Sequence, residues 1–171
     1  MVAHAATEMQ PPVALRYFTP MVPAQIEREI VIEAPIEVVW RVVTEPEHIQ
    51  QWFATEAELE GRVGGTGRLS FANHHTSYLQ VEAFDPPHRF AYRWLHEQGS
   101  KARPGNSTLV EFTLQAEASN TRLRVVESGF DEMDWTDDEK TSYVDDHTSG
   151  WQHFADLLRD YAPRANSPVS E

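Results

Sequence analysis

The sequence predicts an α+β domain in which a curved, seven-stranded antiparallel sheet wraps around a long C-terminal helix. Three observations predict this architecture. One strand-like segment precedes two short helical patterns, and six more strand-like segments with short connections follow, which indicates an antiparallel sheet. An apolar stripe at helical spacing then extends over about 25 residues. A flat sheet would leave one face in water, whereas a curved sheet can bury that stripe on its concave side.

The length and composition fit one domain. The chain has 171 residues, of which 40% are apolar and 24% charged, and the folded unit is expected at 25–162. Residues 1–24 contain four prolines and no sustained periodicity, which predicts a flexible N-terminal arm. Residues 163–171 begin with a proline and are mostly small or polar, which predicts a flexible tail.

The first strand and the two short helices follow from local patterns. Residues 26–33 alternate apolar and charged side chains, as in a strand with one buried face. Pro35 suits the first turn of a helix, and Pro46 opens a second one. Their apolar positions are Ile36, Val39, Trp40 and Val43 in the first, and Ile49, Trp52 and Phe53 in the second. Both helices are too short to be stable alone, so they must pack against apolar surface.

Six further strands are predicted between the short helices and the long one. Their ranges are 55–60, 67–73, 77–84, 88–96, 107–116 and 120–129. Glycines at 64, 65 and 67 allow positive φ angles, and two successive prolines at 86 and 87 block continuation of a strand. The pair Ser119-Asn120 suits a tight hairpin.

The long helix has a start signal, an apolar stripe and a stop signal. Thr136 and Glu139 have the spacing of a capping box, in which each side chain bonds the backbone of the other. The stripe consists of Tyr143, His147, Trp151, Phe154, Leu157 or Leu158, and Tyr161. Pro163 is expected to end the helix because it lacks a backbone N–H.

Six segments, taken in order, carry a family resemblance. They are Ala34–Trp40, Glu45–Phe53, Val63–Gly65, Asp85–Trp94, Thr121–Phe130 and Gly150-Trp151. Over about 26–161 the chain resembles the activator of heat-shock-protein-90 ATPase-like branch of the START/polyketide-cyclase (SRPBCC) superfamily. The resemblance implies the helix-grip fold and a cavity between sheet and long helix that often holds apolar or amphipathic ligands. Because members of this superfamily include both cyclases and chaperone activators, the shared fold alone does not indicate which function this chain has.

Charge and composition exclude several classes of function. The formal charge of −13 would repel nucleic-acid backbones and anionic membrane surfaces. No apolar run approaches the ~20 residues of a membrane helix, so a cytoplasmic location is the default expectation. The chain has no cysteine, and the spacing of its eight histidines does not form a metal site. We therefore expect no metal and no cofactor.

An aromatic interior is the main evidence for a ligand. In the strand 88–96, Phe90, Tyr92 and Trp94 share one face, which should point toward the long helix. Aromatic side chains from other segments should face the same space, which then either remains open for a ligand or is filled by packing. The candidate ligand-binding residues are Trp52, Phe71, Phe90, Tyr92, Trp94, Phe112, Glu127, His147, Trp151 and Phe154.

Glu127 and His147 are the candidate chemical groups. Glu127 shares its strand face with Leu123 and Val125, so its carboxylate should point inward. There it could pair with Arg28 of the neighbouring first strand, anchor a ligand, or act as an acid–base catalyst. His147 lies on the helix stripe, either as a proton shuttle beside Glu127 or as a hydrogen-bonded core residue.

Three hypotheses for function remain open from the sequence. The first is a protein that binds a small hydrophobic or aromatic molecule between the sheet and the long helix. The second is a cyclase- or hydrolase-like enzyme that uses Glu127 and His147. The third is an interaction module for a chaperone or regulator, with a basic partner docking on the acidic segment 131–146. Most of the net charge is concentrated there, since residues 127–146 contain nine acids and one lysine.

Overall fold

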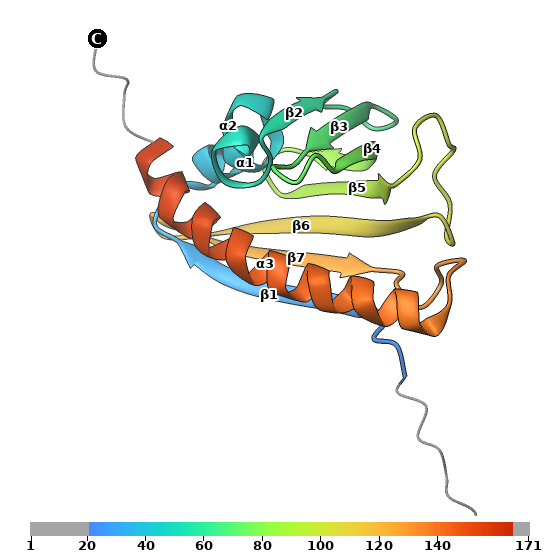
Figure 1. Ribbon diagram of the computed structural model, residues 1–171. Coiled ribbons are helices and arrows are strands. Elements are labelled where there is room, and N and C mark those ends of the chain that lie inside the picture. Colours follow the sequence, from blue (N-terminus) through green and yellow to red (C-terminus); the bar gives the residue numbers. More distant parts are fainter. Residues whose placement is uncertain (1–20, 166–171) are drawn as a thin grey trace, which may run out of the picture.

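Seven antiparallel strands form one sheet in the order β1-β7-β6-β5-β4-β3-β2, and three helices cover its inner face (Figure 1). The structure is a computed structural model, and it describes residues 21–165. The predicted N-terminal arm lies outside the described residues except for 21–24, and the predicted tail does so beyond Ala165. The seven-stranded antiparallel sheet and the long C-terminal helix confirm the predicted fold class.

The observed strands are close to the predicted ones. They are β1 (Gln25–Ile32), β2 (Glu56–Leu59), β3 (Thr66–Ser70), β4 (Thr76–Asp85), β5 (Arg89–Leu95), β6 (Ser107–Glu117) and β7 (Asn120–Ser128). The largest difference is in β3, which ends at Ser70 instead of continuing to residue 73. Phe71 and the residues after it form the turn to β4, where His74 has a positive φ of 63°.

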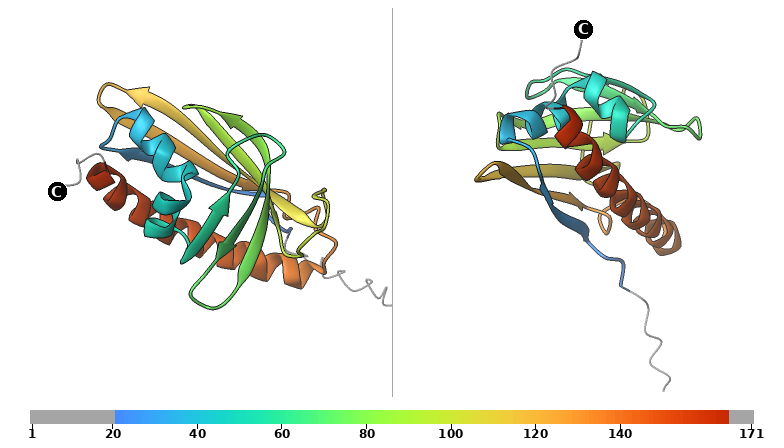
Figure 2. Two further views of the ribbon diagram at one scale, coloured as in Figure 1. Left: turned by 90° about the horizontal axis from the view of Figure 1, so that it is seen from above. Right: turned by 90° about the vertical axis from the view of Figure 1, so that its left-hand side faces the viewer.

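The helices lie on one side of the curved sheet (Figure 2). The long helix α3 (Asp137–Ala165) runs across the sheet next to β1 and β7. The short helices α1 (Ile36–Thr44) and α2 (Pro46–Trp52) lie near the C-terminal end of α3. There the His48 ring Nδ1 lies 2.7 Å from the Tyr161 hydroxyl, which ties α2 to α3.

The buried face of α3 differs from the predicted stripe. The fully buried residues of α3 are Val144, Trp151, Ala155, Leu158 and Ala162. Tyr143, His147 and Phe154 are only partly buried, and Leu157 is 38% exposed. Tyr143, His147, Phe154 and Leu157 therefore lie at the edge of the core, whereas Trp151 of the same stripe lies inside it. Small residues such as Ala155 and Ala162 let the helix approach the sheet closely, which the sequence stripe did not indicate.

The two ends of α3 behave differently. At the N-terminus, the Glu139 carboxylate accepts from the Thr136 backbone N–H at 2.8 Å, and the Thr136 hydroxyl accepts from the Glu139 N–H at 3.3 Å. This reciprocal pair confirms the capping box. At the C-terminus, the prediction that Pro163 ends the helix is wrong, because the helix continues to Ala165. Pro163 removes only one hydrogen bond, to the exposed residue Arg159, whose carbonyl can bond water instead.

The acidic segment 131–146 is on the surface. All eight of its acidic residues are exposed: Asp131, Glu132, Asp134, Asp137, Asp138, Glu139, Asp145 and Asp146. The first-turn acids of α3 lie where the positive end of the helix dipole favours negative charge.

Candidate functional site

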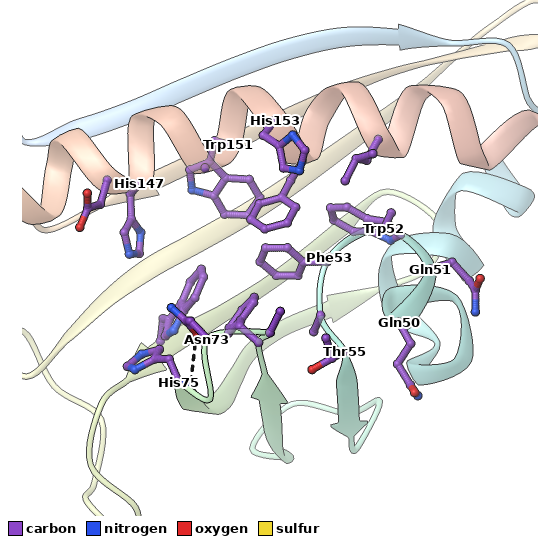
Figure 3. A pocket seen from close by; sticks show the side chains of 18 residues that line it. Gln50, Gln51, Trp52, Phe53, Thr55, Asn73, His75, His147, Trp151 and His153 are labelled. Atoms are coloured by element: carbon purple, nitrogen blue, oxygen red, sulfur yellow. Dashed lines mark hydrogen bonds between the residues drawn. The ribbon is translucent and has the colours of Figure 1, made fainter.

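A cavity of about 600 Å³ opens between the middle of α3, the C-terminal end of α2 and the turn between β3 and β4 (Figure 3). Its apolar walls are formed mostly by aromatic side chains, with Ala54, Ala72 and Leu157 beside Trp52, Phe53, Phe71, Trp94, Trp151 and Phe154. Polar side chains contribute to the lining from Gln50, Gln51, Thr55, Asn73, His75, Asp146, His147 and His153. Several of these polar residues are exposed, so the cavity is open to solvent at its rim.

Phe53 determines where the cavity lies. Its ring is stacked on Trp151 with centroids 5.4 Å apart and meets the edge of Phe154 at 4.8 Å. It also contacts Phe71 and Trp94 at 5.6 and 5.8 Å. Figure 3 shows Phe53 between α3 and the residues of the β3–β4 side. Phe53 thus separates the open cavity from the deeper space under the sheet.

The ten predicted site residues fall into three groups. Trp52, Phe71, Trp94, His147, Trp151 and Phe154 line the cavity. Phe90, Tyr92 and Phe112 instead surround a void of about 10 Å³ on the inner side of Phe53, which is too small for a ligand. Glu127 is fully buried and lies behind His147 and Trp151. The space under the middle of the sheet is therefore packed core, and the open volume lies nearer the rim.

Sequence reasoning missed several lining residues. The sequence places Phe53 only on the apolar side of α2, and no local pattern indicates that its ring meets Phe71, Trp151 and Phe154. His153 and Leu157 lie on the side of α3 next to Phe154, so the helical period could have placed them. Asn73 and His75 belong to a turn, where side-chain direction has no simple period.

Glu127 is held by three side-chain donors. The Thr108 hydroxyl donates to Oε1 at 2.6 Å, and the Trp151 indole N–H donates to Oε2 at 2.7 Å. The ring Nδ1 of His147 lies 2.7 Å from the same Oε2. The glutamate has 0% exposure, so these partners replace the water that a carboxylate would otherwise require. The inward orientation predicted from the strand period is correct.

The hypothesis that Arg28 pairs with Glu127 is wrong. In the β1–β7 register, Ile26 lies opposite Glu127, whereas Arg28 lies opposite Val125. Arg28 donates to the backbone carbonyl of Glu27 at 2.9 Å. The two strands are neighbours as expected, but Arg28 lies two residues away from the position opposite Glu127. The donors that Glu127 requires come instead from Thr108, Trp151 and His147.

His147 links the buried carboxylate to the cavity. Its side chain is 16% exposed, and in Figure 3 it extends from α3 toward the cavity. The ring lies between Trp94 and Tyr143, with centroid distances of 5.1 and 3.9 Å. These contacts and the bond to Glu127 fix the orientation of the imidazole. The site therefore combines apolar walls with one imidazole whose orientation is fixed.

A second polar pair lies beside the first. His96 Nε2 is 3.0 Å from the Tyr143 hydroxyl. Burial is the main cause that raises the pKa of Tyr143 far above its usual value, and the negative charge of Glu127 adds to it. Burial likewise lowers the pKa of His96, with further lowering by His75 and His147 and an opposing effect of Glu127. Both groups are therefore neutral near pH 7.

The structure places no metal-binding cluster near the site. Within residues 21–165, no three His, Cys, Asp or Glu side chains are arranged to hold a metal ion. None of the three helices in the described part of the chain combines the length and apolar character that a membrane crossing requires.

Several solved structures are similar to this chain. Protein MLL2253 from Mesorhizobium loti has a TM-score of 0.68 and 24% identity, and the match covers 84% of this chain and 99% of that one. The Aha1 dimer from Colwellia psychrerythraea has a TM-score of 0.67 and 21% identity, with 85% and 100% covered. CalU16 from Micromonospora echinospora has a TM-score of 0.60 and 23% identity, with 84% and 77% covered. At these identities the likeness establishes the fold.

Sequence comparison identifies the family. No curated protein matches the sequence. The family model described as "Activator of Hsp90 ATPase homolog 1-like protein" matches residues 33–162, from the end of β1 to the last turns of α3. That range includes the strands, helices and turns that form the cavity. The chain therefore belongs to the Activator of Hsp90 ATPase homolog 1-like protein family.

Proposed function

We propose that this protein binds a small, uncharged hydrophobic or aromatic molecule in the cavity beside α3. The observation that carries the proposal is an open volume of about 600 Å³ whose walls are mainly aromatic. Sites for small ligands have volumes of roughly 300–1,000 Å³ and combine apolar walls with a few polar groups. The cavity has both features.

The lining determines the class of ligand. Aromatic walls favour planar or aliphatic surfaces, which gain from burial and from ring stacking. No Lys or Arg lines the cavity among the residues that the structure describes, and Asp146 is at its rim. A carboxylate or phosphate ligand would therefore lose its hydration without gaining a cationic partner. Asn73, Gln51 and the histidines provide hydrogen bonds for a neutral polar group.

Gly150 provides a way to test the site. It lines the cavity, and a Cβ built on it would meet only Phe154, at 3.8 Å, so a larger side chain there would extend into open space. Gly150→Leu should fill part of the cavity without displacing backbone. Ser149→Leu is the matched control, because Ser149 is exposed on the same helix and is not part of the lining.

The experiment uses the neutral fluorescent probe N-phenyl-1-naphthylamine and the full chain. The wild-type protein should enhance probe fluorescence saturably, Gly150→Leu should weaken the affinity about 10-fold or more, and Ser149→Leu should leave it unchanged. Equal affinity for all three proteins, or no saturable binding, would refute the proposal. Native mass spectrometry of freshly purified protein provides an independent test, because a co-purified molecule would identify the natural ligand class directly.

A further inference from the structure

The buried pair Glu127–His147 has the geometry of a carboxylate-oriented general base. Glu127 Oε2 and His147 Nδ1 are 2.7 Å apart, with the carboxylate inaccessible and the imidazole at the cavity wall. The pair is therefore ordered from the core outward: carboxylate, imidazole, cavity. In such an arrangement the carboxylate fixes the orientation and tautomer of the imidazole, and the second ring nitrogen takes part in chemistry.

The hydrogen bonds make both carboxyl oxygens of Glu127 acceptors. An indole N–H can only donate, so Trp151 requires Oε2 to be an acceptor. Thr108 donates to the other oxygen, Oε1. Both oxygens therefore act as acceptors in a place where water cannot reach them. The same Oε2 then accepts the N–H of His147 Nδ1.

The tautomer of His147 follows from this bond. When Nδ1 carries the proton, the neutral ring has its lone pair on Nε2. Within the described residues, Nε2 has no hydrogen-bond partner, and it is not among the buried unpartnered atoms. The ring lines the cavity, so Nε2 is accessible to whatever occupies the cavity.

We propose that the protein hydrolyses an uncharged aryl ester bound in the cavity. In this reaction His147 is the catalytic general base, and Glu127 is the positioning residue that orients it. This inference rests on the proposed function, since the aromatic walls must first hold the aryl group. Water adds its oxygen to the ester carbonyl carbon as His147 Nε2 takes one of its protons. The bond between the carbonyl carbon and the aryl oxygen then breaks, and the leaving aryloxide takes that proton from Nε2. The products are a carboxylic acid and a phenol, and water is the only co-reactant.

The surroundings favour this substrate. The Trp94 ring lies 5.1 Å from the His147 ring and 6.3 Å from the Trp151 ring, so an aryl ester packed against these two indoles lies next to the imidazole. Water reaches the site because the rim includes exposed polar residues such as Gln51 and Asp146. The absence of a lysine or arginine among the described lining residues selects an uncharged ester.

The test measures cleavage of 2-naphthyl acetate by the full chain, with two histidine variants. His147→Gln removes the base, whereas His88→Gln removes an exposed histidine that is not part of the cavity lining. General-base catalysis typically contributes about 10²–10⁴-fold, so His147→Gln should lower kcat at least about 100-fold. His88→Gln should keep the wild-type rate, which would show that cleavage is not a general effect of surface imidazole groups. Equal rates for the wild type and both variants would overturn the inference.

Glu127→Gln tests the positioning role, because glutamine has nearly the same size as glutamate and leaves no cavity. The amide oxygen of the glutamine can accept from Trp151 and His147. Its NH₂ group can donate to the Thr108 hydroxyl, which then becomes an acceptor instead of a donor. We expect kcat to fall about 10-fold or more while KM and the melting temperature stay near the wild-type values. A change in KM or melting temperature with unchanged kcat would show a structural role and would overturn the assignment of Glu127.

Probe binding separates the two proposals. If N-phenyl-1-naphthylamine binds and the ester is not cleaved faster than by His147→Gln, the catalytic inference fails and the proposed function stands. If the probe does not bind, the proposed function fails, and any cleavage that remains belongs to another site.

Discussion

Glu127 is the residue whose burial is hardest to justify by stability alone. A charged carboxylate inside a core is costly unless hydrogen bonds replace its hydration, and removal of one partner leaves the others unsatisfied. Its three partners come from β6 and α3, so the glutamate joins the sheet to the helix. This position connects packing to the chemistry inferred above, because the contacts that make the charge tolerable also orient His147.

Trp151 is the partner that contributes most to packing. It is 4% exposed, contacts Phe53 and Phe112, and donates to Glu127. Trp151→Ala should lower the free energy of unfolding by about 3–5 kcal/mol, because it leaves a cavity and removes one of the two donors to Glu127 Oε2. Urea denaturation measures this change. The control His153→Ala is exposed on the same helix and should change stability by less than about 0.5 kcal/mol. A loss below about 1 kcal/mol for Trp151→Ala would show that the core around it is not well packed.

His96 gives the protein a pH-dependent stability with a defined sign. Its folded pKa lies below the usual 6.5, mainly because of burial, so the unfolded chain binds more protons at acidic pH. The stability contribution is complete above pH 6.5 and is lost as pH falls from there through the folded pKa. The free energy of unfolding should therefore decrease between pH 7.5 and 5.5. In His96→Gln, urea titrations at both values should show a smaller decrease, and identical decreases in the two proteins would disprove this account.

At the scale of single elements, α3 combines two tasks on two faces. Val144, Ala155 and Leu158 pack on the sheet, whereas His147 and Phe154 line the cavity. A helix of 29 residues can do both because its apolar surface is wider than one stripe. The sequence pattern showed the apolar character but merged the two faces, since helical period alone does not fix how a helix is rotated against its sheet.

The capping box at Thr136 should contribute measurably to the stability of α3. Thr136→Ala removes the hydroxyl that accepts from the Glu139 N–H and should cost about 1 kcal/mol of unfolding free energy. The matched control is Ser142→Ala, at an exposed position within the helix, where alanine is at least as favourable. Chemical denaturation of both variants decides the matter, and equal stabilities would mean that the first turn is not fixed by this cap.

At the scale of the whole molecule, the excess of negative charge opposes folding. The formal charge is −13, and the acidic segment 131–146 concentrates much of it near the start of α3. Exposed ion pairs such as Arg122–Glu29 and Arg124–Glu27 link β7 to β1. Each pair of this kind is worth only about 0–1 kcal/mol, so the repulsion summed over the whole surface should be the larger effect.

Salt should therefore stabilise the protein. Between ~0.01 M and ~0.15 M ionic strength, the screening length falls from about 30 Å to about 8 Å, which weakens repulsion between distant carboxylates. The melting temperature should rise over this range, as measured by circular dichroism at pH 7.5. A falling melting temperature would mean that the ion pairs of the sheet outweigh the net repulsion.

The sequence determined the order and type of the elements, the inward direction of Glu127 and the cap of α3, because these depend on the period of two in strands, the period of 3.6 in helices and local hydrogen bonds. Only the tertiary structure decided that Ile26 and not Arg28 lies opposite Glu127, and that Phe53 closes the inner space and leaves the cavity near the rim. Strand register, helix rotation and the volume left between side chains all depend on contacts between residues far apart in the chain. No local pattern in the sequence contains that information.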